Sequence, residues 1–276
     1  MSTKDILSQI VEHKKKEIAE ARKAVSEDQL REQAGVAREK RPFFDSLAHP
    51  GPSGVNIIAE IKRASPSKGI FSPDLDPVTT ATAYEQGGAA ALSVLTDMHY
   101  FKGSRQDLEK ARAATGLPVL RKDFLISAYQ LYEAAVMGAD AVLLIVRILS
   151  AQQLKDYLSL AVELNMDALV EIHAPEDLDV ATRSGARLIG INNRNLKSFD
   201  TDIQTAISMV SSLSSDQIPV AASGIHTPED IERNLQSGIH NFLIGESLVK
   251  APDTVAFIKA LLAAGGNTDA RTTDDT

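Results

Sequence analysis

The stretch Met137-Gly-Ala-Asp-Ala-Val-Leu-Leu-Ile-Val146 decides the fold class, because it joins the end of a helical pattern to an apolar strand within a few residues. Glycine readily adopts the left-handed conformation that closes a helix, and the run that follows has the character of a buried strand. The same arrangement begins at Gln86, Ser184 and Ser237, which makes four copies in one chain. The sequence therefore predicts a repeated unit in which a strand follows a helix after a short turn.

Working outward from these copies gives eight apolar runs separated by amphipathic helical patterns. Helix start signals such as Ser104-Arg-Gln-Asp and Ser150-Ala-Gln-Gln lie between the runs. Parallel strands joined by helices are expected from this alternation, and eight such units most simply close into an α/β fold, the (β/α)8 TIM barrel. An open doubly wound sheet is the alternative. The predicted strands cover residues 55–61, 90–95, 117–121, 139–146, 168–172, 187–191, 218–222 and 240–244.

The residues before the first strand fall outside the repeat and form a helical extension over residues 1–47. Apolar side chains between residues 3 and 23 share one helical face, and Ser26 with Gln29 predicts a capping box that opens a second helix. The extension could close the bottom of the barrel or cover the mouth of its active site, and the sequence does not decide between them. We predict one barrel domain over residues 1–265, extension included, and a frayed tail over 266–276.

Composition excludes several classes of function. The chain has 29 Lys and Arg against 37 Asp and Glu, a net charge of −8, so it has no excess of cations for binding nucleic acid. Its longest aliphatic run, residues 141–146, is too short to span a membrane. Without cysteine it has no disulfide, thiolate ligand or cysteine nucleophile, and its histidines lack metal-ligand spacing, so we predict no metal. No secretory apolar region is present near the amino terminus, which indicates a cytoplasmic protein.

Charged residues interrupt the strands where a barrel carries its chemistry, at the carboxyl ends. With a period of two, Glu60 and Lys62 share one face of the first strand and are predicted to point toward the barrel axis. Lys122 and Glu171 stand at corresponding points of the third and fifth strands. Barrel walls around a cation and a carboxylate can move their pKa values toward the range of proton transfer. His173 could also point inward, but without a Ser or Cys partner it forms no nucleophilic constellation.

Glycine-containing turns after the last two strands predict a phosphate site. Ser223-Gly224 follows the seventh strand, and Gly245-Glu246 follows the eighth immediately before a helix. Such turns present bare backbone N–H groups to an anion, and in barrels they commonly bind phosphate. Lys62 and Ser65 could reach the same anion.

Together these segments resemble the indole-3-glycerol-phosphate synthase family from about residue 5 to residue 263. The resemblance implies conversion of 1-(2-carboxyphenylamino)-1-deoxyribulose 5-phosphate to indole-3-glycerol phosphate, with release of CO₂ and water and without cofactor or metal. The only partner it implies is this small phosphorylated substrate. We expect a monomer, with a dimer as the alternative. The resemblance is carried by Ile61-Lys-Arg-Ala-Ser-Pro-Ser-Lys-Gly69, Leu120-Arg-Lys-Asp-Phe124, Leu169-Val-Glu-Ile-His173, Gly190-Ile-Asn-Asn-Arg-Asn-Leu196 and Ile244-Gly-Glu-Ser-Leu248.

The resemblance also implies a role for each catalytic residue. Lys122 would be the acid at the ketose oxygen, and Lys62 would bind the substrate carboxylate and take part in the later dehydration. Glu171 would stabilise positive charge at nitrogen and act as base or acid in the loss of water. Glu60 would orient the lysines and contact substrate hydroxyls, with Asn192 hydrogen-bonding nearby. Substrate binding is assigned to Ser65, Phe101, Phe124, Leu143, Arg194, Ser223, Gly224, Gly245 and Glu246.

One position departs from the family pattern. Where the family usually reads Glu-Ser-Gly after the seventh strand, this chain reads Ala222-Ser-Gly224, so a carboxylate is missing from the predicted site. A catalytically weakened or engineered barrel that binds the phosphorylated ligand is therefore the alternative function. Phosphoribosylanthranilate isomerase, a similar barrel, is disfavoured because that reaction uses a cysteine base and this chain has none.

Overall fold

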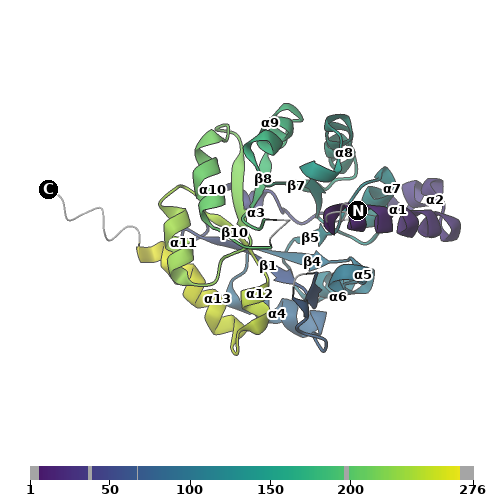
Figure 1. Ribbon diagram of the computed structural model, residues 1–276. Helices are drawn as coiled ribbons and strands as arrows, with labels where there is room; N and C mark the ends of the chain where they lie inside the picture. Colours follow the sequence, from purple (N-terminus) through teal and green to yellow (C-terminus); the bar gives the residue numbers. More distant parts are fainter. Residues whose placement is uncertain (1–5, 37–38, 67, 196–198, 268–276) are drawn as a thin grey trace, which may run out of the picture.

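The computed structural model describes residues 6–36, 39–66, 68–195 and 199–267. Eight parallel strands close into a barrel, so the predicted fold class is confirmed and the open sheet is excluded. Helices surround the strands (Figure 1). Strand β1 pairs with β10 on one side and with β4 on the other, which closes the ring. The barrel strands are β1 (Asn56–Ile61), β4 (Ala91–Leu95), β5 (Val119–Lys122), β6 (Ala141–Ile145), β7 (Asp167–Ile172), β8 (Leu188–Asn192), β9 (Ile218–Ala222) and β10 (Asn241–Ile244).

Side-chain caps begin many of the surrounding helices, which explains why helix follows strand after a short turn. The hydroxyl of Ser104 accepts a hydrogen bond from the Asp107 backbone N–H, and Ser150 with Gln153 forms a capping box. The outer helices are α4 (Pro77–Gly87), α6 (Arg105–Ala114), α7 (Ala128–Val136), α8 (Ala151–Glu163), α9 (Pro175–Arg183), α10 (Gln204–Met209), α11 (Pro228–Leu235) and α13 (Thr254–Ala263). Shorter elements lie in the loops: a hairpin of β2 (Ala64–Ser65) and β3 (Gly69–Ile70), helices α5 (Met98–Phe101) and α12 (Glu246–Lys250), and the 3-10 turns η1 (Val146–Ile148) and η2 (Val210–Ser212).

Each strand contributes to two apolar layers because successive side chains point to opposite faces. On β1, Ile57 and Ala59 pack outward against the helices, whereas Ile58 packs inward with residues of other strands, including Leu120 and Leu169. Glu60 continues the inward face and is buried. The period-two prediction for the first strand is therefore confirmed.

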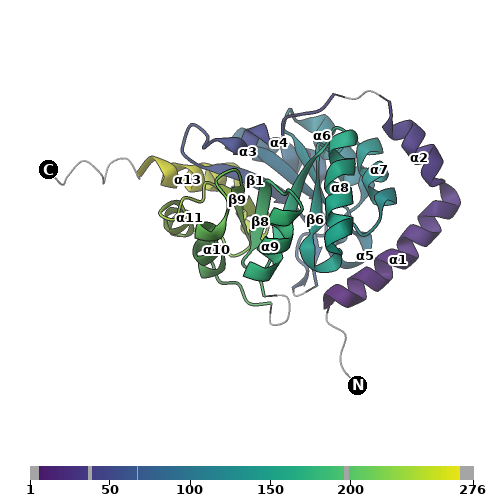
Figure 2. The ribbon, with the colours of Figure 1, turned by 90° about the horizontal axis from the view of Figure 1, so that it is seen from above.

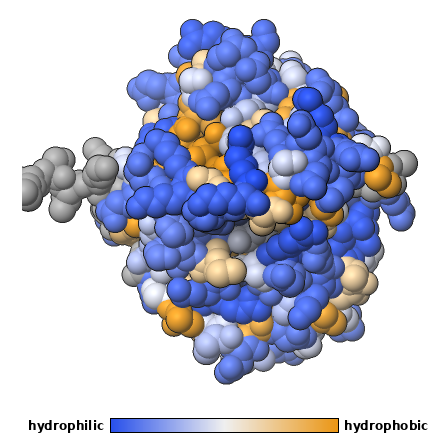
Figure 3. All heavy atoms as spheres, turned by 90° about the vertical axis from the view of Figure 1, so that its right-hand side faces the viewer, coloured by the Kyte–Doolittle hydropathy of each residue, from blue (hydrophilic) through white to orange (hydrophobic). Residues whose placement is uncertain are grey.

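The amino-terminal extension reaches both ends of the barrel. Helix α1 (Ile6–Ala24) begins beside the mouth, and α2 (Glu27–Ala34), which opens with the predicted Ser26–Gln29 capping box, packs against α7. The chain then returns to the opposite end, where α3 (Asp45–Ala48) lies (Figure 2). The face that carries α1 and α2 is mostly hydrophilic, with apolar side chains in separate patches (Figure 3).

Residues 40–48 close the bottom of the barrel. Phe43 and Leu47 are fully buried within the inner apolar layer. Asp167, at the start of β7, pairs with Lys40 at 2.8 Å and accepts a hydrogen bond from the Phe44 backbone N–H at 2.9 Å. Both positions considered for the extension are therefore occupied: the start of α1 lies at the mouth of the barrel, and residues 40–48 close its bottom.

The carboxyl-terminal part of the chain ends in the 3-10 turn η3 (Ala264–Asn267). The predicted frayed tail, 266–276, lies outside the described residues from 268 onward, and residues 266–267 belong to η3. Among the described helices, none combines the length and the apolar composition needed to cross a bilayer.

Candidate active site

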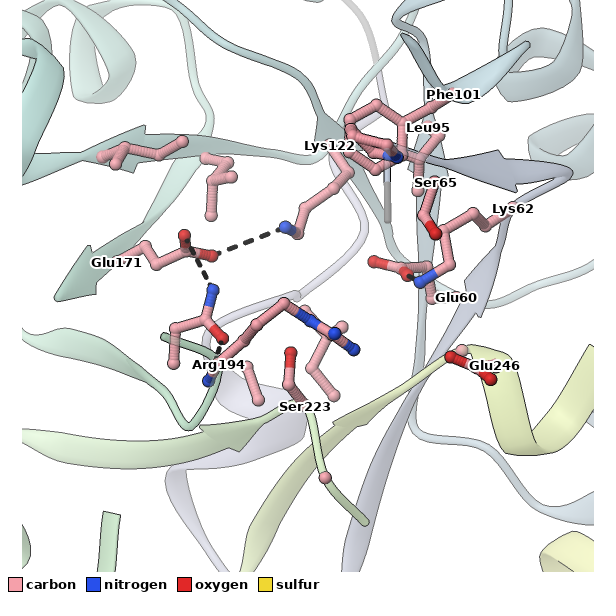
Figure 4. A pocket seen from close by; sticks show the side chains of 18 of the residues that line it. Glu60, Lys62, Ser65, Leu95, Phe101, Lys122, Glu171, Arg194, Ser223 and Glu246 are labelled. Carbon is pink, nitrogen blue, oxygen red and sulfur yellow. Dashed lines mark hydrogen bonds and ion pairs between the residues drawn. The ribbon is translucent and has the colours of Figure 1, made fainter. Parts of the chain in front are cut away.

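A pocket opens at the carboxyl ends of the barrel strands. All fourteen residues predicted for the site line it, and they come from all eight barrel strands or the loops that follow them. Figure 4 shows Lys122 and Glu171 reaching toward each other, with Glu60 and Lys62 on the neighbouring wall. The residues brought together are Glu60, Lys62, Ser65, Phe101, Lys122, Phe124, Leu143, Glu171, Asn192, Arg194, Ser223, Gly224, Gly245 and Glu246.

The first charged pair stands on β1. Lys62 Nζ lies 2.6 Å from Glu60 Oε1, and the Glu60 side chain is 5% exposed. Burial alone would raise the pKa of Glu60, but the positive charges of Lys62 and Lys122 outweigh burial and hold that pKa below its usual value. Glu60 is therefore an ionised carboxylate that keeps a lysine ammonium in place.

The second charged pair crosses the barrel from β5 to β7. Lys122 Nζ lies 3.4 Å from Glu171 Oε2, and Asn192 Nδ2 donates a hydrogen bond to Glu171 Oε1 at 3.2 Å. Burial works to lower the pKa of Lys122, but the carboxylates of Glu171 and Glu60 raise it above its ordinary value. Burial works to raise the pKa of Glu171, but the positive charge of Lys122 keeps the pKa of Glu171 below its ordinary value. At neutral pH the pocket thus holds a protonated lysine beside an ionised glutamate.

A slot with apolar walls lies beside these pairs. The rings of Phe101 and Phe124 lie 6.0 Å apart, centroid to centroid, and Leu143 contributes from β6. Arg194 Nη1 donates a hydrogen bond to the Phe199 carbonyl at 2.9 Å, which fixes the guanidinium at the rim. This arrangement can bind a flat ring near the charged groups.

The glycine turns predicted for phosphate stand at the opposite wall. Ser223 and Gly224 both have positive φ, 68° and 79°, so the backbone turns sharply after β9. A Cβ at Gly245 would lie 2.6 Å from Glu60 Oε1, and only glycine therefore allows this close approach. Ser65 of β2 also lines the pocket, beside Lys62 (Figure 4). Backbone and hydroxyl groups here can bind an anion.

Lysines fix the carboxylate of Glu246. Lys68 and Lys250 contact its Oε1 at 2.6 and 2.7 Å. Burial would raise its pKa, but the hydrogen bonds from Lys250 and Lys68 lower it to about 2. Lys68 lies in the loop after β1, between β2 and β3. It places a cation beside the turn at Gly245-Glu246, and the sequence spacing did not predict that cation.

Ala222 occupies the last position of β9, where the resemblance drawn from the sequence implies a glutamate. Its side chain is buried, lines the pocket and stands in register with Asn192 of β8. The missing carboxylate would therefore point into the same cavity as Glu171.

Several lining residues did not stand out in the sequence. Ile6, Leu7 and Ile10 of α1 reach the mouth, and Phe199 and His173 also line the pocket. The apolar face of α1 was visible in the sequence, but nothing in it showed that its first turns would meet the barrel mouth. His173 has an inward position in the sequence pattern, but it forms no nucleophilic constellation with a Ser or Cys, so the sequence assigns it no role. Among the described residues no cluster of three or more His, Cys, Asp or Glu is placed to hold a metal ion.

Comparisons with known proteins agree closely with one another. The family model described as indole-3-glycerol phosphate synthase matches residues 7–261. The chain is 58% identical to the indole-3-glycerol phosphate synthase of Desulfosudis oleivorans over 94% of this chain and 98% of that protein. It is 51% identical to the protein of the same name from Syntrophobacter fumaroxidans, again over 94% and 98%.

Solved structures with lower identity share the fold alone. The 3-hexulose-6-phosphate synthase of Salmonella typhimurium superposes with a TM-score of 0.62 at 10% identity, covering 76% of this chain and 98% of that one. Thiamine phosphate pyrophosphorylase from Pyrococcus furiosus gives a TM-score of 0.58 at 15% identity, over 78% and 96%.

Proposed function

The chain belongs to the indole-3-glycerol phosphate synthase family, and from that premise we propose how its pocket performs the reaction. The enzyme is a decarboxylating lyase that closes the pyrrole ring of 1-(2-carboxyphenylamino)-1-deoxyribulose 5-phosphate. The products are indole-3-glycerol phosphate, CO₂ and water. The buried Lys122–Glu171 pair at the barrel mouth carries the proposal, because it supplies an acid and a base on the wall of one pocket.

Ring closure requires an acid at the ketose carbonyl. As the ring carbon that bears the carboxylate attacks the ketose carbon, negative charge develops on the carbonyl oxygen. Lys122 donates a proton to this oxygen, and its raised pKa keeps it protonated until then. Lys62 binds the substrate carboxylate, with Glu60 holding the ammonium at 2.6 Å. The bond between the ring carbon and this carboxylate then breaks, CO₂ leaves, and the electron pair of the broken bond restores the benzene ring.

Loss of water then completes the aromatic ring. Lone-pair donation from the substrate nitrogen expels the new hydroxyl, and the positive charge at nitrogen is stabilised by Glu171. Glu171 accepts the proton whose loss restores aromaticity, while Lys62 assists departure of the hydroxyl. Asn192 holds Glu171 Oε1 in place through its 3.2 Å hydrogen bond. All these groups belong to the protein, so the scheme needs no cofactor.

The remaining lining residues bind the two ends of the substrate. The aromatic ring enters the slot formed by Phe101, Phe124, Leu143 and Arg194. The phosphate is bound by Ser65 and by backbone N–H groups of the turns at Ser223-Gly224 and Gly245-Glu246. These assignments are supported by the position of every one of these residues on the pocket wall.

The proposal extends to the molecule's state in the cell. We propose that residues 1–265 fold as one domain and that the enzyme is cytoplasmic. We also propose that it acts as a monomer, because a single chain supplies every group that the mechanism uses. Light scattering tests this, since a dimer would double the measured mass.

The decisive experiment incubates the purified protein with the carboxyphenylamino substrate and follows the appearance of indole fluorescence. We expect turnover. Absence of signal together with tight binding of the product would instead favour the alternative, a weakened barrel that only binds the phosphorylated ligand. That alternative rests on Ala222 alone.

A further inference from the structure

His173 is a buried imidazole that the mechanism above does not use. Its side chain lines the pocket and is 4% exposed. Neither of its ring nitrogens has a hydrogen-bond partner among the described residues. Buried polar atoms without partners are rare and destabilise a fold, so a chain that retains one at its active site calls for a functional explanation.

Neighbouring residues hold the backbone of His173 in place, but its ring makes no hydrogen bond to the described residues. Its backbone N–H donates to Asp177 Oδ2 at 2.8 Å, and Arg147 Nε contacts the same oxygen at 2.8 Å. The ring itself meets Glu171, where His173 Nε2 lies 3.5 Å from Oε1, which is too long for a formed hydrogen bond. A small rotation of either side chain would form it.

Burial favours the neutral imidazole of His173, and four charged groups face the ring. They are Glu171 on β7, Lys122 on β5, Arg147 on η1 and Asp177 on α9. Burial is the largest influence and lowers the pKa of His173; Glu171 and Asp177 act to raise it, Arg147 and Lys122 act to lower it, and the net shift is downward. At neutral pH the ring therefore has one N–H donor.

We propose that His173 is a positioning residue for Glu171, donating from Nε2 to Oε1 when Lys122 turns away from the carboxylate toward the substrate. The inference rests on the proposed function. In the free enzyme Lys122 holds Oε2 and Asn192 holds Oε1. Once Lys122 protonates the ketose oxygen, Glu171 loses its neighbouring cation, and the unused donor of His173 keeps the carboxylate ionised and aimed at the substrate nitrogen.

Three substitutions separate this role from packing. His173→Gln places an amide nitrogen close to the position of Nε2, His173→Asn places one close to Nδ1, and His173→Leu removes both. We expect His173→Leu to lower kcat by roughly ten- to hundredfold with KM within about twofold, at an unchanged or higher Tm because the unpartnered nitrogens are gone. His173→Gln should recover most of kcat, and His173→Asn should not.

The pH profile gives an independent readout. Below its lowered pKa the imidazolium pairs with Glu171 and weakens it as a base, so kcat of the native enzyme should fall toward acid pH. His173→Gln cannot titrate and should extend activity to lower pH. An identical acid limb in both proteins would overturn the proposal.

The control is His240→Gln at the far end of the barrel, where His240 Nδ1 contacts the Gly54 carbonyl, and it should leave kcat unchanged. Full activity of His173→Leu, or equal losses in the Leu and Gln variants with a lowered Tm, would overturn the positioning role. Native enzyme assayed in parallel separates the two hypotheses: if it is inactive the proposed function fails, and if it is active only the role of His173 is at stake.

Discussion

Two lysines and two glutamates neutralise one another inside the pocket before substrate arrives. Each carboxylate keeps its pKa below the usual value although burial alone would raise it. Removing one member leaves an opposite charge buried without its partner, which is strongly unfavourable. At the scale of a single residue, Lys122 therefore has two tasks, proton donation and neutralisation of Glu171.

Lys122→Met tests the proton donor. Methionine has a similar volume and no proton to give, so we expect kcat to fall at least about a hundredfold while the circular dichroism spectrum stays native. Indole fluorescence measures the loss. Lys155→Met, on the exposed face of α8, is the matched control and should keep full activity. More than a few per cent residual activity in Lys122→Met would remove Lys122 from the role of acid.

Ala222→Glu tests the missing carboxylate. A glutamate at the end of β9 would enter the pocket next to Asn192, where it can support the positive charges that develop in the reaction. Such a group contributes about 1–3 kcal/mol, so kcat or substrate affinity should rise by roughly tenfold to a hundredfold. Ala222→Gln controls for size without charge. Unchanged kinetics would show that the existing residues already compensate.

At the scale of elements, one lysine joins helix α1 to the barrel. Lys14 is fully buried, and its Nζ lies 2.9 Å from both Asp97 Oδ2 and Asp123 Oδ1. Asp97 caps α5, which carries Phe101, and Asp123 directly follows Lys122. Helix α1 is thus bonded to two segments that form the pocket wall.

Lys14→Met should destabilise the protein far more than Lys15→Met, although the two residues are neighbours. The first removes a buried ammonium that two buried carboxylates share, which costs about 3–5 kcal/mol. Lys15 is 61% exposed and pairs with Glu12, which is also exposed, so its loss should change stability by less than about 0.5 kcal/mol. Urea denaturation compares the two. Similar midpoints for both variants would contradict the structural role of Lys14.

The same cluster predicts loss of stability in acid. Burial would raise the pKa of Asp123, but Lys14 and Arg121 lower it to about 2 from 3.8. Because the folded pKa is the lower one, Asp123 contributes about 2 kcal/mol above pH 4, and this contribution disappears as the pH falls through about 2. Denaturation midpoints between pH 2 and pH 5 measure the effect. In Lys14→Met the dependence should be weaker.

At the scale of the whole molecule, the two ends of the barrel have different tasks, as is usual for this fold. The mouth collects charged residues, and the bottom is closed by residues 40–48 with Phe43 and Leu47 inside the inner layer. Asp140 supports the closure by accepting hydrogen bonds from the Arg41 and Val119 backbone N–H groups.

The barrel could be predicted from sequence because its signals are local. Each signal involves residues within a few positions of one another. The signals are the glycine that ends a helix, the alternation of inward and outward side chains on β1, and the capping box of Ser26 and Gln29. The course of the extension could not be predicted, because it depends on contacts such as Lys14–Asp97 and Lys40–Asp167 between distant parts of the chain. The same holds for His173, since only the three-dimensional surroundings reveal that its nitrogens lack partners.

Separation of the two ends predicts that a mutation at the bottom changes stability and not catalysis. Phe43 is fully buried, and Phe43→Ala would open a cavity that costs about 3–5 kcal/mol, lowering Tm by roughly 5–15 °C. Phe44→Ala is the matched control: Phe44 is only half-buried, with the Arg187 guanidinium 4.5 Å from its ring centroid, and its loss should cost less than half as much. Both variants, assayed at a temperature where they are folded, should keep kcat within about twofold. A tenfold fall in kcat for folded Phe43→Ala would mean that packing at the bottom sets the geometry of Lys122 and Glu171 at the mouth, and the two ends would then act as one unit.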